Sequence, residues 1–150
     1  MPTKSKSYLI RSPKNKKEFD AYYMLRWEVL RKPLGGSLES TKDEFESKSY
    51  HVIAITSKGE ILGVGRLHDI NNESCQIRYM AIKSRYRNFG IGKSIIINLI
   101  NKAQKKSKKN IILHSREHAI SFYKKNGFVL IRKTHLLLDK IQHYLMHLNL

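Results

Sequence analysis

The stretch Arg85-Tyr86-Arg87-Asn88-Phe89-Gly90-Ile91-Gly92-Lys93-Ser94 decides the fold of this 150-residue chain. It lies between a strand-like segment that ends at Ile82 and a long segment with apolar residues at helical spacing. A glycine-rich turn at such a junction exposes backbone N–H groups at the positive end of the helix dipole, where anions bind. Glycines also let the main chain approach a phosphate closely. The stretch therefore predicts a phosphate-binding loop that opens a helix.

Two common nucleotide-binding motifs do not fit this loop. A P-loop needs a glycine five residues before the Gly-Lys-Ser of residues 92–94, and Arg87 stands there. A dinucleotide-binding fingerprint needs a third glycine three residues after Gly92, and Ile95 stands there. The pattern that remains is Arg-x-x-Gly-x-Gly between a strand and a helix.

Hydrophobic periodicity on both sides of the loop predicts the other elements. Strands are expected at residues 8–11, 51–56, 61–68, 75–82, 111–114, 128–133 and 142–148. Helices are expected behind the cap signal at Asn15 up to Leu30, from about Gly90 to Lys106, and from a cap at Ser115 to a stop at Gly127. In the strand 75–82, alternation places residues 77, 79 and 81 on one face and residues 76, 78 and 80 on the other.

This order of elements predicts the fold class. A helix, an antiparallel meander and a strand–helix–strand crossover indicate an α/β fold with a mixed, mostly antiparallel sheet flanked by helices. No internal repeat or long linker divides the sequence, so residues 1–150 are expected to form a single domain.

Positive charge is concentrated in the second half of the chain. The formal net charge is +17, of which residues 1–75 carry +3 and residues 76–150 carry +14. So large a charge first suggests nucleic acid or an anionic membrane as the partner. The single cysteine, Cys75, excludes a disulfide framework, and the seven histidines show no metal-binding spacing, so no metal is expected. Residues 1–7 resemble no signal peptide and no apolar run could span a membrane, which favours the cytoplasm.

Two signatures in the second half resemble the GCN5-related N-acetyltransferases, the GNAT family. The glycine loop, with the strand 78–82 before it, is similar to the family's pyrophosphate loop. Residues 119–128, a helix that ends in Tyr-x-x-x-Gly-Phe, are similar to its second signature. Residues 25–30 and 141–146 resemble the ElaA-like bacterial subgroup, so that the resemblance covers nearly the whole chain.

The resemblance implies direct transfer of an acetyl group from acetyl-CoA to an amine of a small molecule or a peptide. It implies that the cofactor is held by Met80, Ala81, Ile82, Arg87, Asn88, Phe89, Gly90, Ile91, Gly92 and Lys93. It also implies that Tyr123 is the general acid that protonates the leaving thiolate, a role suited to a phenol. Because Tyr123 lies beside Ile120 on an apolar helix face, packing in the core is the alternative.

The general base is not evident from the sequence. Gln76 stands where several family members carry a carboxylate, and an amide cannot take up the proton. His68, His143 and Glu44 are the alternatives. Arg116 replaces an asparagine that in many members contacts the pantetheine arm, so Arg116 contacts an anion of a ligand or faces solvent. His114 and His118 are expected at the polar surface.

The acceptor is expected to be a cation because acidic residues cluster after the first helix. Glu39, Asp43 and Glu44 are the substrate candidates in this cluster, and Arg78 is a fourth. Two other functions remain open: a basic nucleic-acid-binding module, which lacks any known recognition motif, and a regulatory protein that binds CoA without catalysis. A monomer or a homodimer is expected, with no membrane partner.

Overall fold

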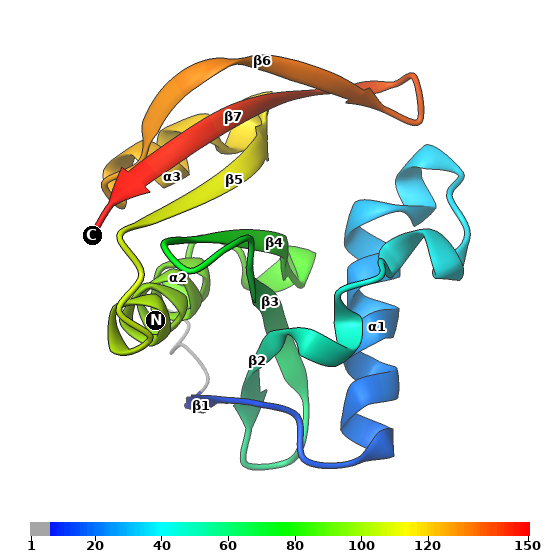
Figure 1. Cartoon of the computed structure of the whole chain (residues 1–150). Coiled ribbons are helices and arrows are strands. Elements are labelled where there is room, and N and C mark those ends of the chain that lie inside the picture. The colour runs from blue at the N-terminus through cyan, green and yellow to red at the C-terminus, as the bar shows by residue number, and fades with distance from the viewer. Residues whose placement is uncertain (1–6) are drawn as a thin grey trace.

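The computed structural model describes residues 7–150 and arranges seven strands in one mixed sheet (Figure 1). The strands are β1 (Tyr8–Arg11), β2 (Tyr50–Thr56), β3 (Ile61–Asp69), β4 (Ser74–Ile82), β5 (Asn110–Arg116), β6 (Val129–Leu137) and β7 (Ile141–Asn149). Their spatial order is β1-β2-β3-β4-β5-β7-β6, and only β4 and β5 pair in parallel. The α/β fold expected from the sequence is confirmed. Of the stretch 1–7, in which no signal peptide is expected, residues 1–6 lie outside the described residues.

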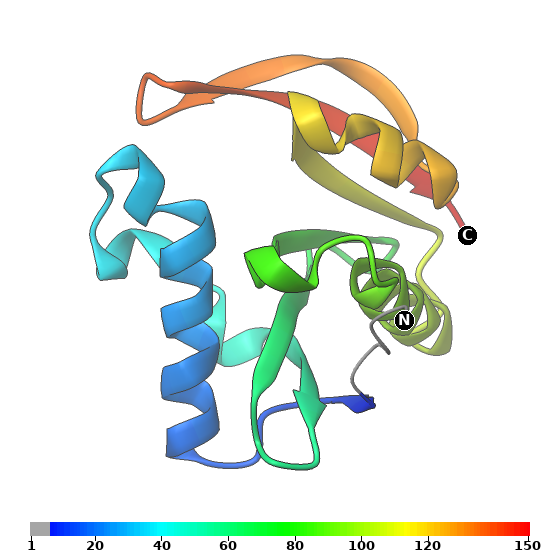
Figure 2. The same ribbon diagram turned by 180° about the vertical axis from the view of Figure 1, so that it is seen from behind.

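Helices cover both faces of the sheet. The structure contains α1 (Lys16–Leu30), α2 (Ile91–Lys105) and the short α3 (Ile120–Lys125). In Figures 1 and 2, α1 lies on one side of β2, β3 and β4, and α2 lies on the other. No helix of residues 7–150 is long and apolar enough to cross a membrane.

The helices form where the sequence predicts them because the capping residues and the apolar stripes mark the same segments of the chain. The side chain of Asn15 accepts a hydrogen bond of 2.9 Å from the N–H of Glu18 and so caps α1. The apolar stripe of α2 is fully buried against the sheet, and each such side chain contributes about 1.5–3 kcal/mol by burial. This packing fixes the N-terminus of α2, and with it the glycine loop, at the end of β4.

A β-bulge in β4 changes the expected alternation. Tyr79 has a left-handed backbone with φ of 58°, and the register with β3 shifts between Val64 and Arg66. As a consequence Ile77 packs in the core that faces α2, whereas Ala81 packs in the core that faces α1. The prediction that residues 77, 79 and 81 share one face is therefore wrong, because the bulge inserts one residue and reverses the phase.

The region before α3 also differs from expectation. Ser115 lies inside β5 and its hydroxyl donates to the carbonyl of Arg116 at 2.7 Å, so it does not cap a helix. A 3-10 turn, Glu117–Ala119, leads into α3 instead. Gly127 does end this helix, with φ of 95°. β6 and β7 are longer than predicted because they form a hairpin beyond the edge of the core.

Candidate active site

A cleft opens in the middle of the sheet where β4 and β5 separate. These strands pair only over Ser74–Gln76 and 110–112, and beyond that they diverge (Figure 1). The bulge at Tyr79 bends β4 away from its neighbour. A cavity of 1010 Å³ fills the gap, lined by both strands, the glycine loop, α3 and the end of α1. The facing strand edges offer backbone donors and acceptors to an extended ligand that contains amides.

The glycine loop ends in the free N-terminus of α2. Gly90 is the N-cap residue with φ of 82°, a left-handed conformation that glycine adopts without strain. The first hydrogen bond of the helix runs from the N–H of Ser94 to the carbonyl of Gly90, at 3.1 Å. The N–H groups of the first turn, before Ser94, therefore have no acceptor in the helix. Arg87 and Lys93 line the same part of the cavity, which makes it an anion site.

The two glycines of the loop have different roles. A Cβ at Gly92 would lie 3.2 Å from the Cζ of Phe122, so this glycine lets α3 pack closely on the start of α2. A Cβ at Gly90 would meet nothing within 4 Å. Gly90 is therefore needed for its backbone conformation, and Gly92 for close packing.

Most of the residues predicted to hold the cofactor line this cavity. They are Met80, Ala81, Ile82, Arg87, Asn88, Gly90, Ile91, Gly92 and Lys93. Phe89 is not among the lining residues and is 41% exposed. Free helix N–H groups, basic side chains and unpaired strand edges together fit a ligand with a pyrophosphate and an amide-containing arm, as CoA has.

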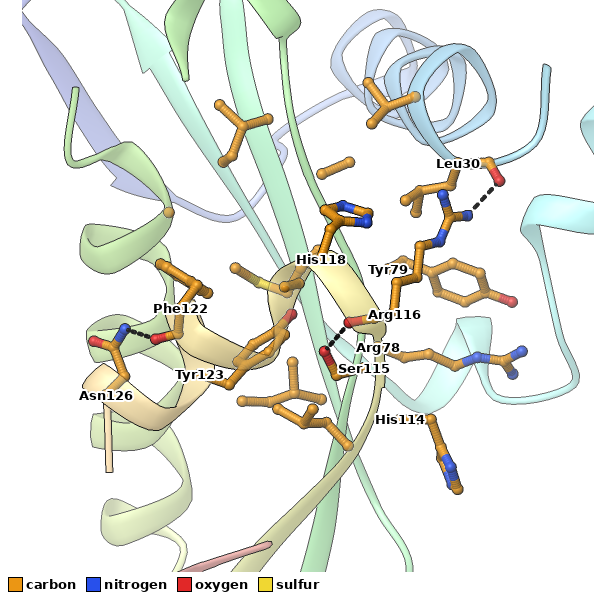
Figure 3. A pocket seen from close by; sticks show the side chains of 18 of the residues that line it. Leu30, Arg78, Tyr79, His114, Ser115, Arg116, His118, Phe122, Tyr123 and Asn126 are labelled. Atoms are coloured by element: carbon orange, nitrogen blue, oxygen red, sulfur yellow. Dashed lines mark hydrogen bonds between the residues drawn. The ribbon is translucent and has the colours of Figure 1, made fainter. Parts of the chain in front are cut away.

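Tyr123 lies in the wall of the cavity, between the loop and the end of α1. Its ring contacts Phe122 and Phe128 edge-on, with centroid distances of 5.1 and 5.8 Å, so it also packs in the core. Its hydroxyl points into the cavity (Figure 3) and makes no hydrogen bond with any residue of the described chain. Burial raises the pKa of this phenol well above its usual value, which keeps the hydroxyl protonated.

His143 reaches the cavity from β7. Its Nδ1 lies 3.1 Å from the carbonyl of Ile141, which fixes the neutral ring with Nδ1 protonated and Nε2 free. Its ring stacks on His135 of β6 at 4.6 Å. Burial lowers the pKa of His143 to about 4, against the raising effect of the hydrogen bond to Ile141. The imidazole is thus neutral at physiological pH.

His68 is placed differently, outside the cavity lining. Its Nδ1 lies 2.8 Å from the guanidinium of Arg66, which can only donate, so this nitrogen carries no proton. Its ring stacks on Phe45 at 4.4 Å. Burial, and next the charge of Arg66, lower the pKa of His68. The lone pair that a general base would use is already occupied, and this geometry favours His143 over His68.

Two residues of the acidic cluster after α1, Asp43 and Glu46, form ion pairs with arginines. Asp43 forms ion pairs with Arg66 at 2.7 Å and with Arg78 at 2.8 Å. Glu46 pairs with Arg66 and, at 2.9 Å, with Arg26. These bonds hold the pKa of Asp43 well below its usual range despite burial. The substrate candidates Glu39, Asp43 and Glu44 do not line the cavity, whereas Arg78 does.

The cavity also contains residues whose place the sequence left open or assigned to the surface. Arg116 is not at the surface: it is half-buried and donates to the carbonyl of Leu30 at 2.7 Å. His114 is also half-buried in the lining, and its ring contacts that of His135 at 5.4 Å. His118 is exposed, as expected, yet borders the cavity.

His135 lies outside the predicted strand 128–133, so its contact with His143 is not predictable from the sequence pattern. Within residues 7–150, no group of three or more His, Cys, Asp or Glu residues could hold a metal ion.

Comparison with known proteins identifies the fold. The family model of the acetyltransferase (GNAT) domain matches residues 29–150. An uncharacterised N-acetyltransferase of Bacillus subtilis strain 168, YjcF, is 27% identical over 133 residues, which are 89% of this chain and 94% of that protein. The likeness to the ElaA-like subgroup stays a prediction.

Solved structures show the same architecture. A putative N-acetyltransferase from Lactobacillus plantarum superposes with a TM-score of 0.81 at 16% identity, covering 96% of this chain and 97% of that one. A GNAT acetyltransferase from Elizabethkingia anophelis with acetyl-CoA bound has a TM-score of 0.76 at 16% identity, covering 95% and 98%. An aminoglycoside 6'-N-acetyltransferase complexed with coenzyme A has a TM-score of 0.79 at 14% identity, covering 94% and 96%. The chain therefore belongs to the GNAT family of N-acetyltransferases.

Proposed function

We propose that this enzyme acetylates a primary amine of a small molecule or a peptide in the cavity between β4 and β5. One observation carries the proposal: a single cavity joins the free N-terminus of α2 to a buried, protonated tyrosine hydroxyl. The first feature suits the phosphates of the proposed acetyl donor, acetyl-CoA, and the second suits its leaving sulfur.

The donor is proposed to lie along β4 and the loop. The backbone of Met80–Ile82 would pair with the amides of the pantetheine arm. The first-turn N–H groups of α2 would hold the pyrophosphate, with Arg87 and Lys93 adding positive charge. This placement brings the thioester toward Tyr123, between the loop and the end of α1.

In the reaction, the neutral amine attacks the thioester carbonyl, a C–N bond forms and the C–S bond breaks. The hydroxyl of Tyr123 would donate its proton to the departing sulfur. Burial raises the pKa of the phenol, and the same surroundings raise the basicity of a thiolate, so the two remain matched.

His143 is the proposed acceptor of the amine proton. With Nδ1 held by Ile141, its Nε2 is free to accept, directly or through a water. A group with a pKa of about 4 is a weak base, but it needs to act only as the C–N bond forms, when the attacking nitrogen becomes acidic. His68 remains a second candidate with a less favourable geometry.

An acetyl-transfer screen over polyamines, amino acids, aminoglycosides and peptides tests this proposal. We expect acetyl-CoA-dependent product with a mass increase of one acetyl group for at least one class. Tight binding of CoA with only slow turnover, at a rate that Tyr123→Phe leaves unchanged, would favour a regulatory protein instead.

A further inference from the structure

The end of the cavity next to α1 is strongly basic. Arg31, Arg78 and Arg116 line it, and no Asp or Glu is among the lining residues of the described chain. Figure 3 shows Arg116 reaching Leu30 at the end of α1 and Arg78 extending below it, both on the opposite side of the view from Phe122 and Asn126. These arginines are thus separate from Arg87 and Lys93, which lie by the loop proposed for the donor phosphates.

Two of the arginines lack a carboxylate partner among residues 7–150. Arg116 donates to the carbonyl of Leu30, and Arg31 donates to the carbonyls of Leu30 and Ser40, at 3.2 and 3.1 Å. Arg31 is only 5% exposed, and Arg116 is half-buried. A buried charge without a counterion is costly in a folded protein.

Arg78 adds a third cation to this group. Its one carboxylate contact among the described residues is Asp43, which it shares with the buried Arg66. The guanidinium of Arg78 also lies 4.7 Å from the ring of Tyr79, and that of Arg31 lies 5.7 Å from the same ring. Four arginines surround Tyr79, namely Arg26, Arg31, Arg66 and Arg78, and within residues 7–150 their carboxylate partners are Asp43 and Glu46 alone. Arg116, which shares the carbonyl of Leu30 with Arg31, adds a further cation.

A structural role explains part of this arrangement. Leu30 is the last residue of α1, and cations commonly bond to the carbonyls at a helix C-terminus. That role uses few of the N–H donors of Arg31 and Arg116, and one cation would suffice. It leaves unexplained why guanidiniums, which repel one another, gather at a cavity wall. The repulsion is visible at Arg31, whose pKa is lowered by burial and also by the charges of Arg78 and Arg116.

We propose that this end of the cavity binds an oxyanion of the acceptor, a carboxylate or a phosphate, through Arg78 and Arg116 with Arg31 behind them. Planar guanidiniums bind both oxyanions through paired hydrogen bonds. The acceptor is then a small amine that also carries an anionic group, and not the cation that the acidic cluster suggests. This inference rests on the proposed function, because it names the acceptor of that same site.

The first test compares matched acceptors with wild-type enzyme. The probes are ω-amino acids from glycine to 5-aminopentanoate, their carboxamides, the aminoalkyl phosphates of similar length, and the matching diamines. We expect kcat/KM to be at least about tenfold higher for the carboxylates, or for the phosphates, than for the carboxamides of similar length. This margin corresponds to about 1.4 kcal/mol. A preference for the carboxamides or the diamines would overturn the inference.

The second test uses variants. Arg78→Gln and Arg116→Gln should raise KM for the preferred anionic acceptor at least about tenfold, while kcat/KM for its carboxamide changes little. Arg132→Gln, which removes an exposed charge of β6 outside the cavity lining, is the matched control. Equal losses of kcat/KM with the anionic acceptor and with its carboxamide would show that the arginines serve only the fold.

A binding measurement keeps the two proposals apart. CoA, and then the N-acetylated product of each probe, are titrated calorimetrically into the wild-type protein. Absence of CoA binding would remove the proposed function, and this inference with it. CoA binding without any difference between the carboxylate or phosphate products and their uncharged counterparts would remove this inference alone.

Discussion

At the scale of single residues, Tyr123 is a phenol that packs in the core and yet presents its hydroxyl to the cavity. Tyr123→Phe preserves the ring contacts with Phe122 and Phe128 and removes only the proton donor. We expect kcat to fall about 100-fold or more, within the usual range for loss of a general acid, with CoA affinity unchanged. Steady-state kinetics and calorimetry check this. An unchanged kcat would show that Tyr123 serves packing alone.

His143 couples the site to the pH dependence of stability. Its pKa is about 4 in the folded chain, against about 6.5 for an ordinary histidine. Below pH 6.5 the unfolded state therefore binds more protons, and the stabilisation present above that pH is lost as the pH falls toward 4. His143→Gln should reduce the loss in the free energy of unfolding between pH 7 and 4, by at most about 3 kcal/mol.

Denaturant unfolding at several pH values measures this effect. The exposed His118 provides the control, because His118→Gln removes an imidazole that stays in solvent. If both variants showed the same dependence on pH as the wild type, His143 would not be the residue that resists protonation.

At the scale of elements, the loop before α2 depends on one backbone conformation. Gly90 and Gly59 both have positive φ, 82° and 88°, and a Cβ at either would meet nothing within 4 Å. Gly90→Ala and Gly59→Ala should therefore cost similar stability, about 1 kcal/mol each. Only Gly90→Ala should weaken CoA binding, because Gly59 lies in the β2–β3 turn. Thermal unfolding and calorimetry separate these effects, and equal CoA affinities would contradict the assigned role of the loop.

The elements and the loop could be read from the sequence because local signals determine them. The cap at Asn15, the stripe of α2 and the glycine turn each act within one element or one junction. The bulge at Tyr79 could not, because its phase change depends on pairing with β3. His135 likewise meets His143 only through the irregular register of β6 and β7.

The acidic cluster shows the same limit at the site. Its charge pointed to a cationic acceptor, because a sequence shows which acids are present but not which bases they meet. In the fold, Asp43 and Glu46 meet Arg66, 20 or more residues away along the chain. Asp43 and Glu46 thus belong to the ionic contacts between α1, the following loop and the sheet, and no acid of the cluster lines the cavity.

At the scale of the whole molecule, this buried ionic network joins α1, the following loop, β3 and β4. Arg66 is fully buried, and Arg66→Met would leave Asp43 and Glu46 without their shared cation. Breaking a buried pair in this way costs about 3–5 kcal/mol. Arg85→Met, which breaks an ion pair with Glu60 at a side chain that is 69% exposed, should cost less than about 1 kcal/mol.

Chemical denaturation of both variants checks this contrast. Comparable small losses would mean that the network does not hold α1 on the sheet. A large loss in the free energy of unfolding for Arg66→Met alone would support a stabilising role of the network. It would also explain why Asp43 and Glu46 pair with arginines instead of lining the cavity.

The distribution of charge over the molecule also bears on its partners. The half of the chain with net charge +14 includes the glycine loop, β5 and α3, which line much of the cavity. A donor with several phosphates needs only a few of these charges. Nonspecific nucleic acid would bind the same surface with an affinity that falls steeply as salt rises.

Calorimetric titration of CoA into the wild-type protein, at about 150 mM salt, tests the central claim most directly. The account predicts saturable binding at one site per chain, retained when the salt is doubled and weakened by Gly90→Ala. Absence of saturable CoA binding, with binding only of a nonspecific oligonucleotide at low salt, would contradict it.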